Sequence, residues 1–181
     1  DLAGFAMAAD NDVPMAAKAH IATSAFLGVN MKCARCHDAP YHDWTQRDLF
    51  SLAAMLERKS LSIPTTSSVP AEFFEGEQAG ESLITLSVKA GDQIDPAWSL
   101  QRFTPDTELD SLPKDARHRF AYQITRVENR QFAMTIVNRL WKQLMGQGIV
   151  EPVEDWEGAD PSHPRLLDYL AREFASADFD F

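Results

Sequence analysis

Only two cysteines occur among the 181 residues of this chain, and a histidine directly follows the second of them. The run is Cys33-Ala34-Arg35-Cys36-His37. At this spacing one helical turn can bring both thiols and the imidazole to a single flat ligand. The pattern is typical of covalent haem c attachment, in which two thioether bonds fix the porphyrin. We therefore expect one haem, with Cys33 and Cys36 as attachment points and His37 as the proximal iron ligand.

A chance match, a thiol–disulfide module and a zinc site are the other interpretations of the cysteine pair. Both cysteines fall inside the motif and none remains for another role, so a chance match explains the pattern poorly. A thiol–disulfide module would use the same spacing, but the strand–helix–strand context of such motifs is missing here. A structural zinc site would need two further ligands nearby, and no second Cys or His pair offers them.

The sixth coordination position of the iron is open to several residue types. Histidine or methionine would give a closed electron-transfer site, whereas an empty position would favour ligand binding or peroxide chemistry. The distal candidates before the motif are His20 and Met15, since a preceding helix can cross the distal face. Met55 lies on the predicted following helix. His42 comes soon after His37, so we expect it on the proximal side or at the haem rim.

Charge argues against several classes of partner. The chain has 27 acidic and 17 basic residues and a formal net charge of −10. Nucleic acid requires a basic face, and an anionic membrane surface attracts basic segments. No apolar run approaches the length of a membrane span. The sequence therefore predicts a protein that meets a basic or neutral partner, with its oligomeric state left open.

The two ends of the chain bear on its cellular location. Asp1-Leu2-Ala3-Gly4 shows no charged region followed by an apolar stretch, so no signal peptide is predicted. Residues 172–181 end on an apolar side chain, which favours an internal piece of a longer chain over a processed one. Because haem is attached to such motifs outside the cytoplasm, we expect a periplasmic or otherwise extracytoplasmic protein.

Helical periodicity dominates the hydrophobic pattern. It predicts helices over 13–32 and 43–59, two helices within 115–145 that part near Glu128-Asn129-Arg130, and a last helix from Ser162-His163-Pro164. Residues 60–113 are rich in turn residues, with one strand predicted over 83–88. A long irregular stretch of this kind can wrap the haem edge.

These elements define a fold class and a domain organisation. The predicted class is mainly α, a helical c-type haem domain with a small β or irregular insertion and a helical C-terminal part. The expected ranges are a haem-binding segment over 1–60, a linker region over 61–114, and a helical companion domain over 115–181.

Two parts of the sequence resemble one known family. The run from Phe26 to Pro40 resembles the haem-motif segment of planctomycete-type cytochrome c proteins, and residues 48–56 resemble the helix that follows it there. The second half is similar to a companion domain found downstream in the same proteins. Its matching segments are Val137-Asn138-Arg139-Leu140-Trp141, Gly146-Gln147-Gly148-Ile149-Val150-Glu151-Pro152, Asp155-Trp156, Pro161-Ser162-His163-Pro164, Leu166-Leu167-Asp168 and Phe174.

The resemblance implies an exported haem protein and a fragment of a longer chain. It transfers Cys33, Cys36 and His37 as haem residues, and no distal ligand. Our first hypothesis is a single-haem c-type cytochrome that transfers electrons to a redox protein, a carrier rather than a catalyst. The alternatives are a five-coordinate haem enzyme or sensor with peroxidase-like or small-ligand chemistry, and a partner-binding scaffold with a structural haem.

Overall fold

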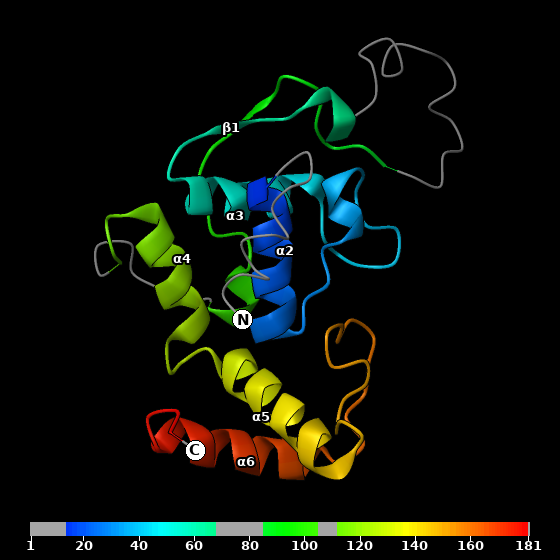
Figure 1. The fold of residues 1–181 in the computed structure, drawn as a ribbon, viewed down its shortest axis with the longest axis vertical. Helices are drawn as coiled ribbons and strands as arrows, with labels where there is room; N and C mark the ends of the chain where they lie inside the picture. Colours follow the sequence, from blue (N-terminus) through cyan, green and yellow to red (C-terminus); the bar gives the residue numbers. More distant parts are fainter. Residues whose placement is uncertain (1–13, 68–84, 105–111, 181) are drawn as a thin grey trace. The chain divides into compact units, whose positions relative to one another are not determined.

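The computed structural model describes residues 14–67, 85–104 and 112–180 (Figure 1). Its α-helices are α2 (Pro14–Leu27), α3 (Gln46–Glu57), α4 (Ala116–Thr125), α5 (Arg130–Met145) and α6 (Pro164–Ser176). Its other elements are the 3₁₀ turns η1 (Cys33–Arg35), η2 (Thr65–Ser67) and η5 (Gln101–Phe103) and the strands β1 (Leu61–Ser62) and β2 (Gln93–Ile94). This confirms a mainly α fold with a small β and irregular insertion and a helical C-terminal part. Over these ranges no helix is long and apolar enough to cross a membrane.

The chain divides into two compact units. Among the described residues, unit 1 comprises 14–21, 31–67, 85–100 and 113–120, and unit 2 comprises 22–30, 101–104, 112 and 121–180. The boundary falls within α2 and within α4, so each of these helices contributes to both units. The expected domain ranges 1–60, 61–114 and 115–181 stay a prediction.

Helix α3 forms the core of unit 1. It begins with a capping box, in which Thr45 Oγ1 accepts the Asp48 N–H and the Asp48 carboxylate accepts the Thr45 N–H. This pairing satisfies two amides at the helix start. The elements η1, β1 and β2 all pack against α3. Its fully buried apolar side chains are those of Leu49, Phe50, Leu52, Ala53, Ala54 and Met55.

The small sheet lies elsewhere than the sequence pattern predicts. It pairs β1 and β2 antiparallel, with Leu61 opposite Ile94. The strand predicted over 83–88 is wrong for residues 85–88, which join no sheet, and residues 83–84 lie outside the described ranges. Polar groups of this segment bind Asp38 instead, because Thr85 O accepts the Asp38 N–H and Ser87 Oγ donates to the Asp38 carboxylate. The alternating pattern of these residues therefore does not produce a strand.

The side chain of Asn129 binds both the end of α4 and the start of α5. The Asn129 side chain accepts the Phe132 N–H in the first turn of α5. Its Nδ2 also donates to the carbonyls of Gln123 and Ile124 near the end of α4. The predicted break near residues 128–130 is therefore confirmed, and Asn is suited to it because its amide both donates and accepts.

Helices α5 and α6 build the apolar core of unit 2. Figure 1 shows α5 crossing α6. Helix α5 ends at Gly146, whose φ of 84° is left-handed, and α6 begins at Pro164 as predicted. The buried core residues are Ala133, Val137, Ile149, Val150, Leu167, Ala171 and Phe174.

The buried Asn138 side chain ties α5 to the loop that leaves it. Its Oδ1 accepts the N–H groups of Ile149 and Val150, at 2.7 and 3.0 Å, and its Nδ2 donates to Val150 O at 2.8 Å. Asn138 is fully buried and Ile149 is nearly so. Three polar backbone groups inside unit 2 therefore depend on one side chain.

Replacing Asn138 with alanine is expected to lower the free energy of unfolding by about 2–3 kcal/mol, because each buried amide left without a partner costs about 1–3 kcal/mol. Urea denaturation followed by circular dichroism measures the change. The exposed Gln143 on the same helix supplies the control Gln143→Ala, with an expected loss below about 0.5 kcal/mol. Equal losses in the two variants would contradict this account of Asn138.

Candidate haem site

The cysteine motif folds as one tight turn. Residues Cys33–Arg35 form η1, and the N–H groups of Cys36 and His37 both donate to Cys33 O, at 3.1 and 3.2 Å. Ala34 is fully buried, whereas Cys33 and Cys36 are exposed free thiols. The turn therefore packs against unit 1 through Ala34, and both cysteine sulfurs stay accessible for bond formation.

The His37 ring has one nitrogen engaged by the backbone. Its Nδ1 lies 2.8 Å from Asp38 O. A carbonyl oxygen only accepts hydrogen bonds, so Nδ1 carries the proton, and the neutral ring then has its free lone pair on Nε2. Metal-binding histidines commonly donate their second ring N–H to a backbone carbonyl in this way. The side chain is thus in the tautomer that a proximal iron ligand requires.

His20 is held in the opposite tautomer. Its Nδ1 accepts the Met31 N–H at 3.2 Å, so a neutral ring carries its proton on Nε2. Burial lowers the pKa of His20 below its ordinary value of 6.5, and the positive charges of Arg35 and Lys32 lower it further. The ring is therefore neutral at pH 7. Ligation of iron by its Nε2 would require the Met31 hydrogen bond to be released.

The other distal candidates lie in different surroundings. Met55 is completely buried in α3, so its sulfur reaches a ligand only if the side chain leaves the core of unit 1. His42 is half-buried in the loop between the motif and α3. Met15, half-buried on α2, lines a small cavity of unit 1 with Lys18, Leu56 and Arg117. The choice of sixth ligand stays a prediction.

Haem c fits this set of residues. The group needs two accessible thiols and one imidazole lone pair, and Cys33, Cys36 and His37 supply them on adjacent positions. A bare metal ion needs more protein ligands. Across residues 14–67, 85–104 and 112–180, no three His, Cys, Asp or Glu side chains are grouped so that they could hold one.

Sequence reasoning missed Asp38 as a site residue. The signal was present, since an acidic residue after the motif and before a predicted helix start is suited to bind backbone N–H groups. The residues that complete its surroundings, Thr85 and Ser87, are distant in sequence and carry no such signal.

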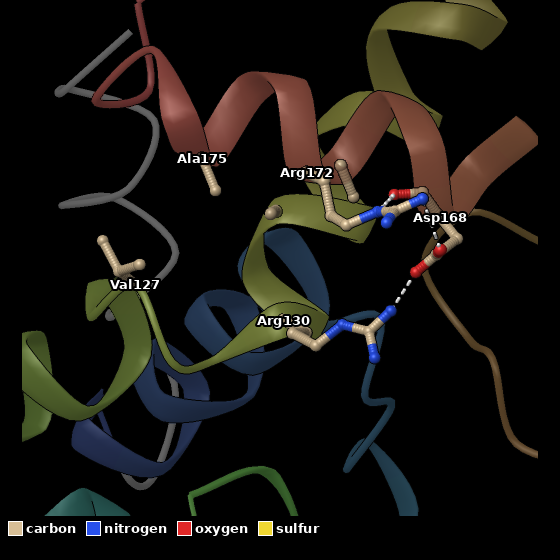
Figure 2. A pocket seen from close by; sticks show the side chains of 7 residues that line it. Val127, Arg130, Asp168, Arg172 and Ala175 are labelled. Atoms are coloured by element: carbon tan, nitrogen blue, oxygen red, sulfur yellow. Dashed lines mark hydrogen bonds and ion pairs between the residues drawn. The ribbon is translucent and has the colours of Figure 1, made fainter.

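A cavity lies in unit 2 between α5 and α6. This cavity of about 460 Å³ is walled mainly by small apolar side chains, with Arg130, Asp168 and Arg172 at one side (Figure 2). The Asp168 carboxylate binds both guanidinium groups, Arg172 at 3.2 Å. Each of the three charges thus faces an opposite charge, and the Arg130–Asp168 pair links α5 to α6.

Comparison with known proteins gives two family matches. Residues 6–60 match the sequence model of PSCyt2, described as a protein of unknown function (DUF1549). Residues 116–181 match that of PSD1, described as a protein of unknown function (DUF1553). No curated protein and no solved structure matches the chain. The part of the chain that contains the cysteine motif is therefore similar to PSCyt2, and its last part is similar to PSD1; both families are typical of planctomycete-type proteins.

Proposed function

We propose that this chain is a c-type cytochrome that binds one haem covalently and transfers electrons. The observation that carries the proposal is the His37 ring, whose Nδ1 is bound to Asp38 O beside two exposed thiols. When bound, the haem supplies an iron centre that exchanges one electron. The match to two families of unknown function is compatible with this role and does not specify it.

The residues of the motif have separate tasks in this proposal. Each cysteine thiol adds across one vinyl group of the porphyrin: a thioether bond forms from Sγ, and the thiol hydrogen goes to the other vinyl carbon. The addition consumes no oxidant, and it needs both sulfurs as thiols, the state in which Cys33 and Cys36 occur. His37 Nε2 would bind the haem iron.

Location and partner follow from the same proposal. Haem is attached to this motif outside the cytoplasm, so the protein would work in the periplasm or another extracytoplasmic compartment. Its formal charge of −10 favours a redox partner protein with a basic or neutral docking face.

Visible spectra of the purified protein, oxidised and then reduced with dithionite, test the proposal. We expect a Soret band, a sharp α-band on reduction, and a low-spin oxidised form. A protein without a Soret band after production with haem-attachment machinery would overturn the haem proposal and favour the dithiol interpretation of Cys33 and Cys36.

A five-coordinate haem that binds a small ligand or peroxide is the second candidate. It is favoured by the state of two distal candidates, since His20 Nδ1 is bonded to the Met31 N–H and Met55 is fully buried. The oxidised spectrum separates the two candidates, because an open position gives a high-spin iron.

We expect His20→Ala to leave the spin state of the oxidised haem unchanged, because the hydrogen bond from Met31 holds this ring in the tautomer that cannot ligate through Nε2. Absorption spectra of the variant and the wild type check this expectation. His42→Ala serves as a parallel variant at another candidate position. Conversion of a low-spin to a high-spin spectrum by His20→Ala alone would identify His20 as the sixth ligand.

A further inference from the structure

Asp38 directly follows the motif and is bound through both its backbone and its side chain. Its carbonyl oxygen accepts the His37 Nδ1–H at 2.8 Å, and its own N–H donates to Thr85 O at 2.8 Å. Its Oδ1 accepts the Gln46 N–H and the Ser87 hydroxyl, both at 2.7 Å. One residue therefore joins the motif, the start of α3 and the segment 85–87.

The N–H of the peptide group that contains the Asp38 carbonyl also forms a hydrogen bond. The Ala39 N–H, in the same plane as Asp38 C=O, donates to Trp44 O at 2.9 Å. The carbonyl direction toward His37 is thus determined by partners on both sides of the Asp38 Cα. Thr45 and Asp48 already form the capping box of α3, so Asp38 is additional to the cap that the helix needs.

The direction of this carbonyl matters for the ligand that it touches. An acceptor on Nδ1–H increases the basicity of an imidazole ligand, and its strength depends on distance and angle. A more basic axial ligand stabilises the oxidised iron and lowers the reduction potential. Whatever holds Asp38 O in line with Nδ1 therefore contributes to that potential.

We propose that Asp38 is a positioning residue, whose carboxylate holds the backbone carbonyl that orients His37 and thereby lowers the reduction potential of the haem. The inference rests on the proposed haem function. The carboxylate acts as a hydrogen-bond acceptor for Gln46 and Ser87, and its negative charge is incidental to this role.

Three variants of the haem-loaded chain test this inference by spectroelectrochemical titration. Asp38→Ala removes the acceptor and the charge, Asp38→Asn removes only the charge, and Ser87→Ala removes one donor at an exposed position. At a fixed applied potential we expect Asp38→Ala to shift the ratio of reduced to oxidised haem upward by about tenfold, similar to the smallest effects on metal affinity or activity when a group that orients a metal ligand is removed. Ser87→Ala should shift it upward by about twofold and Asp38→Asn by less than that.

The outcomes separate the inference from the function on which it rests. Wild-type protein without covalent haem would overturn both. If every variant binds haem and the reduction potential of Asp38→Ala equals that of the wild type, only the role of Asp38 is overturned. Equal shifts of the reduced-to-oxidised ratio in Asp38→Ala and Asp38→Asn would show that the charge of Asp38 causes the effect. That result would also overturn the positioning role of Asp38. Should Asp38→Ala fail to fold, a Ser87→Ala potential equal to that of the wild type would overturn the inference.

Discussion

Replacing both Cys33 and Cys36 with serine is expected to abolish covalent haem in this chain. Thioether bonds are the only covalent link that the motif offers, and a serine hydroxyl does not add to a vinyl group under the same conditions. The measurement is haem absorbance that stays with the polypeptide after denaturation, together with the intact mass of the chain. We expect no haem absorbance with the denatured polypeptide and an intact mass equal to that of the chain without haem. No further cysteine exists to replace the pair.

The single variants and a neighbouring residue provide the controls. Cys33→Ser and Cys36→Ser should each keep one thioether, with reduced yield and an altered α-band. Lys32→Ala, an exposed change directly before the motif, should leave attachment unchanged. Covalent haem in the double serine variant would contradict the assignment of the attachment points. A colourless wild type that forms a reversible Cys33–Cys36 disulfide would favour the thiol–disulfide alternative.

Gly28→Ala is expected to destabilise unit 2 by about 3 kcal/mol or more, through backbone strain and overpacking together. Gly28 has φ of +63°, and a Cβ there would lie 2.5 Å from Cδ1 and 2.7 Å from Nε1 of Trp156. The indole cannot easily move aside. Its Nε1–H donates to Val153 O at 3.1 Å, and the Trp156 N–H donates to Gly28 O at 2.8 Å. Urea denaturation followed by circular dichroism gives the free energy of unfolding.

Gly158 offers a matched control for this substitution. Its φ of +66° is close to that of Gly28, but a Cβ there would meet no non-neighbouring atom within 4 Å in the part of the chain that the structure describes. Gly158→Ala therefore carries the conformational strain without the clash, with an expected cost of about 1–2 kcal/mol. Equal costs at the two positions would show that contact with Trp156 adds nothing. If Gly28→Ala still binds haem covalently, the loss of stability in unit 2 does not affect haem attachment at the cysteine motif.

Local signals in the sequence were sufficient for the helices. The apolar periodicity places α2, α3, α5 and α6 close to where they occur, although the predicted range 13–32 extends beyond the observed end of α2 at Leu27. Helix-breaking residues explain the boundaries, because Asn129 and Gly146 act through neighbours a few positions away. The mainly α fold class follows from these local interactions alone.

The strand prediction failed because its outcome depended on a distant residue. Residues 85–88 have the alternating pattern of a strand, yet Thr85 and Ser87 bind Asp38, which lies more than forty positions earlier. Pairing in a sheet depends on which partner reaches the segment, and the pattern of one segment does not identify that partner.

The sequence by itself determined the candidate chemistry of this protein, because Cys33, Cys36 and His37 are adjacent in the chain and need only one turn to act together. It also determined the helices, since their signals repeat within a few residues. Only the tertiary structure decided which ring nitrogens are available in His37 and His20 and how Asp38 is held. The His37–Asp38 contact joins neighbouring residues, but the direction of the Asp38 carbonyl depends on hydrogen bonds of Asp38 with Thr85 and Ser87, which approach it only after folding. The tautomer of His20 likewise depends on the Met31 N–H, which reaches the ring only when the chain turns back after α2.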